Sequence, residues 1–228
     1  MTDPTKGVVI LGGSFNPPHT GHFRLAIELY EAFSEEISEI VLLPCAIPPH
    51  KETRTLLPFD LRCQMLEACI GDFPWLSVSR MEGERKTPSY TWETLREWSR
   101  RYPEKKLYFA LGSDDYTDLS QWFRGLEIPK LCTLIVFPRG NFTKNDFVAV
   151  SQNFWGDCEE ETQDGCFVVR FQSDLRSVFF TAPWLPISAT DIRRRWKENR
   201  SLSYLLPDEC LRLVKENKEI VQMAWGRS

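Results

Sequence analysis

The most informative stretch of the chain reads Gly12-Gly13-Ser14-Phe15-Asn16-Pro17-Pro18-His19-Thr20-Gly21-His22. It follows an apolar run, residues 8–11, which predicts a fully buried strand. It precedes residues 23–30, whose apolar side chains recur at helical spacing. The stretch is therefore a strand-to-helix turn, where glycines let backbone N–H groups approach an anion and the helix dipole favours negative charge.

Two of the chain's three histidines, His19 and His22, lie in this turn, and the third, His50, lies in a loop after another predicted strand. The turn has neither the Gly-Lys-Ser/Thr ending of a Walker loop nor the G-x-G-x-x-G dinucleotide fingerprint. Histidines near a helix start can be plain surface residues, but a pair behind Gly-Gly and Pro-Pro favours a phosphate site.

Length and composition are those of a soluble globular chain. Its 228 residues suffice for one large domain with its own core, so a single domain over residues 1–228 is expected. The net charge of −4 argues against bulk nucleic-acid binding. No apolar run is long enough for a bilayer and the first residues lack a signal-peptide pattern, so we expect a cytoplasmic protein without membrane or nucleic-acid partners. Monomer and homo-oligomer both stay open.

Cysteine usage indicates reduced thiols. The chain has seven cysteines, an odd number without a C-x-x-C pair, which argues against a disulfide framework or a zinc site. Cys158 and Cys166 flank an acidic stretch, residues 157–164, for which a solvated loop is favoured over a metal site.

Strand-like and helix-like segments alternate along the chain. Further strands are predicted at residues 39–43, 76–79, 106–111, 131–137, 166–171 and 178–181. Helices are predicted over residues 58–70, from Ser89, around Leu119, Trp122 and Phe123, from Ser188, and once more after residue 209. Residues 139–176 are the least regular part, with a polar loop and a candidate helix besides the strand. The alternation predicts an α/β fold, a Rossmann-like doubly wound parallel sheet with helices on both faces and a small C-terminal helical part at about residues 188–228.

In such a sheet the ligand lies beyond the carboxyl ends of the strands, so the loops after Leu11, Leu43 and Leu111 should surround one crevice. Neutral donors, cations and a helix start would meet there: His19, His22, His50, Lys51, Ser188, Thr190 and Arg193. This set suits a polyphosphate. A phosphate nucleophile is already anionic, so nucleotidyl transfer at such a site needs no general base.

The turn resembles the (T/H)-x-G-H signature of the nucleotidylyltransferase superfamily. Four further motifs are similar to those of bacterial nicotinate mononucleotide adenylyltransferases: Pro48-Pro49-His50-Lys51, Ser89-Tyr90-Thr91-x-x-Thr94-Leu95, Leu111-Gly112-Ser113-Asp114 and Ile187-Ser188-Ala189-Thr190-x-Ile192-Arg193. The resemblance implies an enzyme of NAD biosynthesis that transfers AMP from ATP to nicotinate mononucleotide and releases pyrophosphate. It also implies Mg²⁺ bound with the ATP.

The resemblance implies three sets of site residues. The catalytic set is His19, His22, Lys51 and Arg193. The ATP-binding set is Gly12, Gly13, Ser14, Phe15, His19, His22, His50, Gly112, Asp114, Ile187, Ser188, Thr190 and Arg193. The mononucleotide-binding set is Ser14, Asn16, Lys51, Tyr90, Thr91 and Trp122, with Trp122 stacked on the pyridine ring. No residue is assigned to a metal.

The chain departs from the family pattern at three places. Asn16 stands where many members have Asp, so a carboxylate role cannot be assumed there. Ala189 replaces a serine, which leaves Ser188 and Thr190 as the hydroxyl donors. Asp115-Tyr116 follows the Gly-Ser-Asp turn where an apolar residue is more usual, which leaves the local packing open.

Plainer roles exist for several of these residues. Trp122 could be core packing, and Thr91 could be a cap residue. Lys51 and Arg62 could be generic surface charges. Arg193, in the first turn of its helix, is expected to point at phosphate, whereas Arg194 points about 100° away and is expected to be exposed.

Two rival functions remain. One is another transferase of the superfamily, which would use nicotinamide mononucleotide, a pantetheine phosphate or a CTP substrate. The other is a non-catalytic nucleotide-binding regulator, which would bind ATP without releasing pyrophosphate. The retention of both His19 and His22 argues against the regulator.

Overall fold

The contacts within the chain divide it into two compact units. The structure is a computed structural model that describes residues 6–49, 53–71, 73–163, 166–171, 175–183 and 185–226. Unit 1 comprises residues 1–11, 35–38 and 90–182, and unit 2 comprises residues 12–34, 39–89 and 183–228. Each unit is described by itself.

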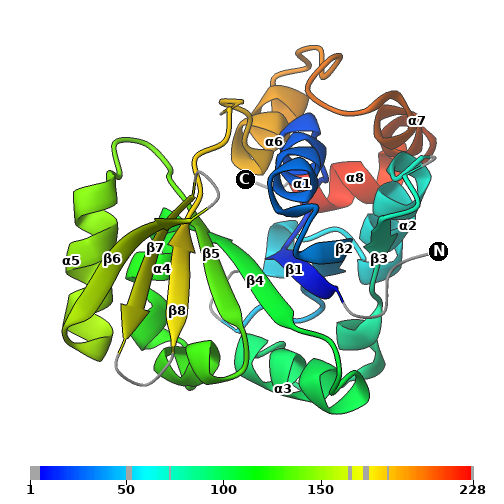
Figure 1. The fold of residues 1–228 in the computed structure, drawn as a ribbon. Helices are drawn as coiled ribbons and strands as arrows, with labels where there is room; N and C mark the ends of the chain where they lie inside the picture. The colour runs from blue at the N-terminus through cyan, green and yellow to red at the C-terminus, as the bar shows by residue number, and fades with distance from the viewer. Residues whose placement is uncertain are drawn as a thin grey trace. The chain divides into compact units, whose positions relative to one another are not determined.

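Unit 1 is built on parallel strands that are continuous apolar runs. β1 (Gly7–Gly13) pairs with β4 (Leu107–Gly112), β4 pairs with β5 (Thr133–Phe137), and β5 pairs with β8 (Arg176–Phe179), all in parallel (Figure 1). All residues of β4 and β5 are buried. Burial on both faces explains why these strands carry no polar alternation, as the sequence predicted.

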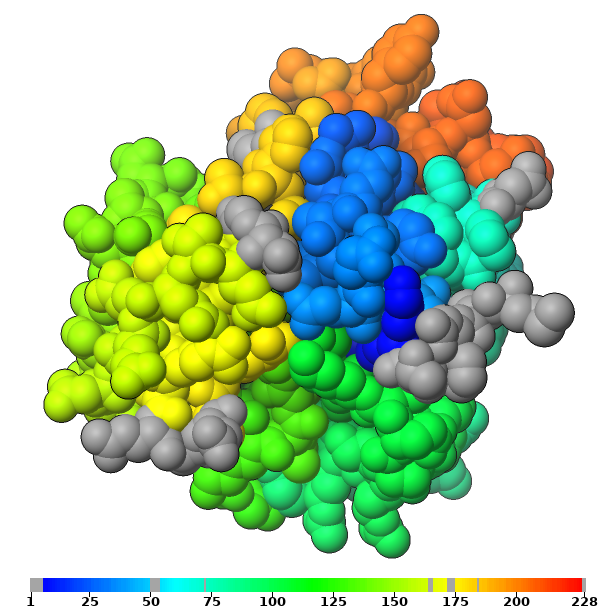
Figure 2. Space-filling view, in the orientation of Figure 1, coloured from blue at the N-terminus to red at the C-terminus, as the bar shows by residue number. Residues whose placement is uncertain are grey.

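An antiparallel hairpin extends the same sheet beyond β8. It consists of β7 (Cys166–Phe171) and β6 (Cys158–Gln163), so the strand order in this unit is β1-β4-β5-β8-β7-β6. The expectation of a solvated loop over residues 157–164 is therefore wrong. The exposed charges of β6 are typical of an edge strand that does not pair further. Figure 2 shows this edge as the yellow-green surface beside α5 (Lys144–Trp155).

The segment after β4 is tighter than expected. It contains a short helix, α4 (Ser113–Thr117), and two 3-10 turns, η3 (Leu119–Gln121) and η4 (Gly125–Lys130). The predicted helix around Leu119, Trp122 and Phe123 is wrong, because the backbone is extended at Trp122 and left-handed at the residue before Gly125. A Cβ on Gly125 would lie 1.9 Å from the Leu119 carbonyl oxygen, so only glycine permits this turn.

Tyr116, the unusual residue after the Gly-Ser-Asp turn, is an anchor for α5. Its side chain is fully buried and its ring lies against Phe147, Phe154 and Trp155. Its hydroxyl lies 2.6 Å from Ser151 Oγ, and since that hydroxyl donates to a carbonyl of its own helix, Tyr116 is the donor. A tyrosine thus satisfies its polar atom while filling an aromatic cluster. The other helix of the unit is α3 (Thr91–Arg101).

Unit 2 contains a parallel pair, β2 (Ile37–Pro44) with β3 (Leu76–Val78), and most of the helices. They are α1 (Thr20–Phe33), α2 (Phe59–Cys69), α6 (Ala189–Lys197), α7 (Asp208–Glu216) and α8 (Lys218–Trp225), with 3-10 turns η1 (Thr53–Thr55) and η2 (Met81–Glu84). The last helix expected from the sequence is two helices, divided at Asn217. Within the described ranges, no helix is long and apolar enough to cross a membrane.

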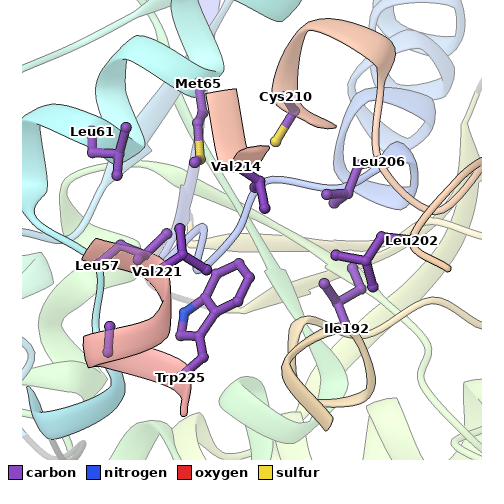
Figure 3. Packing of buried hydrophobic residues seen from close by; sticks show 11 residues of the cluster. Leu57, Leu61, Met65, Ile192, Leu202, Leu206, Cys210, Val214, Val221 and Trp225 are labelled. Atoms are coloured by element: carbon purple, nitrogen blue, oxygen red, sulfur yellow. The ribbon is translucent and has the colours of Figure 1, made fainter. Parts of the chain in front are cut away.

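The core of unit 2 joins α2 to the C-terminal helices. In Figure 3 the indole of Trp225 lies among Leu57, Val214, Val221 and Ile192. Trp225 has no exposed surface. The buried residues of this cluster pack against Leu57, just before α2, and against Ile192 of α6. This shared core therefore keeps the start of α6 close to the turn that follows β1.

Candidate active site

The turn after β1 is strained and buried. Phe15 is left-handed, with φ 45°, although it is neither glycine nor asparagine. Its ring is 1% exposed and lies 4.8 Å from the ring of His22. A Cβ on Gly13 would meet the Phe15 ring at 3.3 Å. Backbone strain of this kind persists where the surroundings hold it, and it is enriched at functional sites.

His19 and His22 are brought together as expected. Their rings stack with centroids 3.6 Å apart, and the His19 backbone N–H donates to His22 Nδ1 at 3.1 Å. Because Nδ1 is the acceptor, the ring proton of neutral His22 is on Nε2, which is therefore the donor atom. Gly21 leaves room for this stack, since a Cβ there would lie 3.1 Å from His19 Nδ1 and would press on the ring.

In this turn the backbone amides before α1 offer more open donors than the first N–H of the helix, among the described residues. The Thr20 N–H donates to the Leu205 carbonyl at 3.0 Å, so that helix-terminal donor is already used. In the described part of the chain, by contrast, the three successive N–H groups of Ser14, Phe15 and Asn16 have no acceptor. Successive amides around a left-handed residue form a concavity that suits an anion.

The Asn16 side chain is engaged by protein groups. It is 4% exposed, its Nδ2 donates to the Thr55 carbonyl at 2.7 Å, and its Oδ1 accepts from Leu57 N at 3.0 Å and from Trp225 Nε1 at 3.3 Å. An amide serves both kinds of partner, whereas an ionised carboxylate offers only acceptors. The departure from Asp at this position thus has a local structural reason.

The start of α6 presents the residues that the sequence selected. Ser188 is the N-cap, and its Oγ accepts from Asp191 N at 3.1 Å, so the predicted cap is present. Arg193 Nη1 donates to the Asn16 carbonyl at 2.8 Å and Nη2 donates to Thr190 Oγ1 at 3.1 Å. Burial lowers the pKa of Arg193, but a guanidinium stays charged. Two of its five donors are used, and it lies directly beside the turn.

The neighbours of Arg193 in the sequence have other surroundings, and the exposure of Arg194 agrees with the prediction. Arg194 is exposed and pairs with Asp191. The side chain of Ile187 is half-buried against the core of unit 2. His50 and Lys51 lie outside the described residues, so their expected roles stay predictions.

Sequence reasoning missed the role of Arg62. It was weighed only as a surface charge, but its side chain is completely buried on α2 and donates to the Ser14 carbonyl. Helical spacing does place Arg62 on the apolar face of α2, because Met65 and Leu66 follow it by three and four residues. A charged residue was not expected to be buried there.

Unit 1 holds the remaining predicted residues. Tyr90 is the N-cap of α3 without a side-chain cap bond, which leaves the start of this helix uncapped before Thr91. Gly112 ends β4, and the exposed Asp114 lies 3.9 Å from the guanidinium of Arg139. Trp122 is half-buried, and no described aromatic ring stacks on it. Partial exposure distinguishes Trp122 from a fully packed core tryptophan.

Among the residues that the structure describes, no group of three or more His, Cys, Asp or Glu side chains could hold a metal ion. The donors that surround the turn are amide, imidazole and guanidinium N–H groups, which suit phosphate oxygens.

The fold and this turn define a class of protein. Residues 10–195 match the sequence model of the cytidylyltransferase-like family, and the chain belongs to that family. A probable nicotinate-nucleotide adenylyltransferase of Geobacter metallireducens is 32% identical over 214 residues, which cover 92% of this chain and 95% of the relative. One from Citrifermentans bemidjiense is 34% identical, with the same coverage.

Solved structures agree on the fold. The nicotinic acid mononucleotide adenylyltransferase of Plasmodium falciparum complexed with NaAD aligns with a TM-score of 0.71 at 18% identity, over 94% of this chain and 97% of that chain. A putative nicotinate-nucleotide adenylyltransferase of Vibrio parahaemolyticus aligns with a TM-score of 0.63 at 17% identity, over 95% and 96%. The predicted Rossmann-like α/β fold and the resemblance to nucleotidylyltransferases are confirmed.

Proposed function

We propose that the chain is the adenylyltransferase that joins nicotinate mononucleotide to the AMP part of ATP in NAD biosynthesis. The names of its curated relatives support this activity. The observation that carries it is the turn after β1, where three successive N–H groups with no acceptor among the described residues lie beside the stacked pair His19 and His22.

In this reaction the mononucleotide phosphate attacks the α-phosphorus of ATP. A bond forms from its oxygen to that phosphorus, the bond from the α-phosphorus to the bridging oxygen breaks, and pyrophosphate leaves with the electron pair. The nucleophile is anionic at neutral pH, so no residue has to remove a proton. The protein aligns the two phosphates and stabilises the charge that develops on them.

The turn and the start of α6 supply those donors. His22 Nε2–H and the amides of Ser14 and Phe15 face the α-phosphate of ATP and the attacking phosphate of the mononucleotide. The remaining donors of Arg193 hold the leaving pyrophosphate. The N–H groups of Ala189 and Thr190, which have no acceptor among the described residues, assist them. The expected contributions of His50 and Lys51 add to this set.

The residues of unit 1 recognise the two nucleosides. Gly112 and Asp114 contact the ATP ribose, and the start of α3 with Tyr90 and Thr91 receives the substituent of the pyridine ring. Trp122 stacks on that ring. Mg²⁺ bound with ATP would supply neutralisation of phosphate charge, and the described residues offer no carboxylate cluster that would hold the ion by itself.

A pyrophosphate-release assay tests the proposal. Wild type should release pyrophosphate with ATP and nicotinate mononucleotide, and should not do so with a pantetheine phosphate or with CTP in place of ATP. The exposed Arg194 gives a matched control, since Arg194→Ala should behave as wild type. ATP binding without pyrophosphate release from any mononucleotide would favour the regulator instead.

We also propose that residues 1–228 act as one nucleotidylyltransferase domain, working in the cytoplasm. Catalysis by the intact chain, with loss of activity on removal of either residues 90–182 or the C-terminal helices, would support the single domain.

A further inference from the structure

Arg62 is a buried cation that makes no direct ion pair among the described residues, although the carboxylate of Glu82 attracts it from a greater distance. Its side chain has no exposed surface, its Nε donates to the Leu57 carbonyl at 3.0 Å and its Nη1 donates to the Ser14 carbonyl at 2.7 Å. Its Nη2 is buried and has no hydrogen-bond acceptor in the described part of the chain. Burying a charge without pairing it is costly, so this arrangement calls for a reason beyond packing.

The Ser14 carbonyl that Arg62 holds belongs to the peptide that leads into Phe15. Arg193 holds the Asn16 carbonyl on the other side of the same residue. Two guanidinium groups, from α2 and α6, therefore fix the backbone on both sides of left-handed Phe15. A strained residue keeps such a conformation only where its neighbours determine it.

Fixing this carbonyl also aims an amide. In a planar trans peptide the C=O and the N–H point in opposite directions, so the Phe15 N–H points away from Arg62. It is one of the three successive N–H groups, those of Ser14, Phe15 and Asn16, that have no acceptor among the described residues. The positive charge of Arg62 lies on the carbonyl side of this peptide, where burial limits its screening by solvent and the charge of Glu82 offsets part of it.

We propose that Arg62 is a positioning residue that holds the Ser14–Phe15 peptide so that its amide, and the amides on either side, receive a substrate phosphate. The proposal rests on the proposed function, which supplies the phosphate. Arg62 touches no substrate itself. It acts through the turn, and its buried charge adds to the attraction.

Two substitutions at Arg62 and one on the same helix test this role. Arg62→Met removes every donor and the charge but keeps an unbranched side chain, and Arg62→Lys keeps the charge but replaces the forked guanidinium with a single ammonium group. Leu66→Ala removes packing one turn further along α2 at a residue without exposed surface, so it reports what a structural loss alone does. Each variant is assayed for kcat, for both KM values and for the affinity of magnesium pyrophosphate by calorimetry.

Arg62→Met should lower kcat at least about tenfold, because a displaced phosphate donor misaligns the reacting groups. It should weaken pyrophosphate binding by a similar factor while the KM for the mononucleotide changes little. Arg62→Lys should fall between Arg62→Met and wild type. Leu66→Ala should have a lower melting temperature than wild type, while its kcat and its affinity for pyrophosphate in the folded state stay unchanged.

The proposal is overturned if Arg62→Met, when folded, matches Leu66→Ala in kcat and pyrophosphate affinity; the adenylyltransferase activity of wild type would then still stand. It is also overturned if wild type binds no pyrophosphate. If Arg62→Met does not fold, Arg62→Lys decides, and wild-type values for it would overturn the proposal. Pyrophosphate binding that depends on Arg62, without pyrophosphate release from any mononucleotide, would instead support Arg62 and remove the proposed function.

Discussion

At the scale of single residues, the local bond of His22 sets its role. Its Nδ1 accepts the His19 N–H, which places the ring proton on Nε2. We predict that His22→Ala lowers kcat about 10²-fold or more, because a donor to charge that develops in the transition state is lost. Steady-state kinetics on the folded variant measure this.

The same bond also caps α1, so stability has to be separated from chemistry. His22→Gln gives the matched control, since glutamine at this position can reach back to the same N–H. It should recover the melting temperature that His22→Ala loses and leave kcat low. An unaltered kcat in a folded His22→Ala variant would remove His22 from the mechanism.

Trp122 is a partly exposed indole on an extended backbone. We predict that Trp122→Ala raises the KM for the mononucleotide by the equivalent of about 1–3 kcal/mol, the range for a base stacked on an aromatic ring, and hardly changes the KM for ATP. Trp122→Phe should retain most of the affinity. Trp98, which is 9% exposed on α3, gives a packing control, because Trp98→Ala should lower the melting temperature without this KM split. If Trp122→Ala behaves like Trp98→Ala, core packing is its role.

The residues found and missed by the sequence differ in their physical signal. His19, His22, Ser188 and Arg193 are recognisable because helix starts require caps and phosphates require donors. Arg62 gives neither of these signals, because its partners are two backbone carbonyls, one just before α2 and one in the distant turn after β1, and neither is visible as a side chain in the sequence.

At the scale of elements, buried parallel strands were predictable and short connections were not. Apolar runs identified β1, β2, β4 and β5 because burial on both faces removes all alternation. β6 was read as a loop since its side chains are polar, yet its strand form comes from pairing with β7 rather than from burial. The turn at Gly125 could not be foreseen, because it depends on close contact with the Leu119 carbonyl.

The elements of unit 1 are tied together by a carboxylate. Glu36, before β2, accepts hydrogen bonds from Tyr108 of β4 and from Arg176 of β8, the latter at 3.0 Å. Burial raises the pKa of Glu36, but the hydrogen bonds from Tyr108 and Arg176 outweigh it, and the net pKa is lowered. A lowered folded-state pKa means that the ionised form stabilises the folded state above the pKa of the unfolded chain, near 4.3.

We therefore predict that Glu36→Gln reduces the free energy of unfolding by about 1 kcal/mol at pH 7, discounted because the side chain is partly exposed. The difference from wild type should shrink as the pH falls through the folded-state pKa of Glu36, where wild type also loses the charge. Urea unfolding across this range measures both. Glu35→Gln, an exposed neighbour, is the control and should change little at any pH. A difference that persists unchanged at low pH would contradict the role of the ionised carboxylate.

At the scale of the whole molecule, the sequence predicts the α/β class because parallel strands buried on both faces are connected by helices. The alternation of strand-like and helix-like segments can be recognised in the sequence. The division into two compact units could not be predicted from the sequence, since unit 1 takes its residues from three separate segments. Such a division depends on the density of contacts in space, and sequence periodicity gives no information on it.

The last prediction concerns substrate choice, between the acid and the amide form of the mononucleotide. The nicotinate carboxylate only accepts hydrogen bonds, whereas the nicotinamide group also carries two donors. At the start of α3 no side chain caps the helix, and the N–H groups of Thr91 and Trp92 have no acceptor among the described residues. An uncapped helix start suits an anion, with hydrogen bonds to a charged group contributing about 1.5–3 kcal/mol and the helix terminus about 0.3–1 kcal/mol more.

The amide would turn its NH₂ toward these donors and leave at least one of them unpaired. At about 1.4 kcal/mol for each factor of ten, we predict a preference for the acid mononucleotide of about 10²-fold or greater in kcat/KM. Thr91→Val, which removes a hydroxyl donor at the same helix start, should narrow that preference while the KM for ATP is retained. The measurement is kcat/KM for both mononucleotides at saturating ATP. Equal values, or a preference for the amide, would contradict the nicotinate assignment and leave the proposal of an adenylyltransferase with a different acceptor, since that proposal rests on the turn after β1 and not on the start of α3.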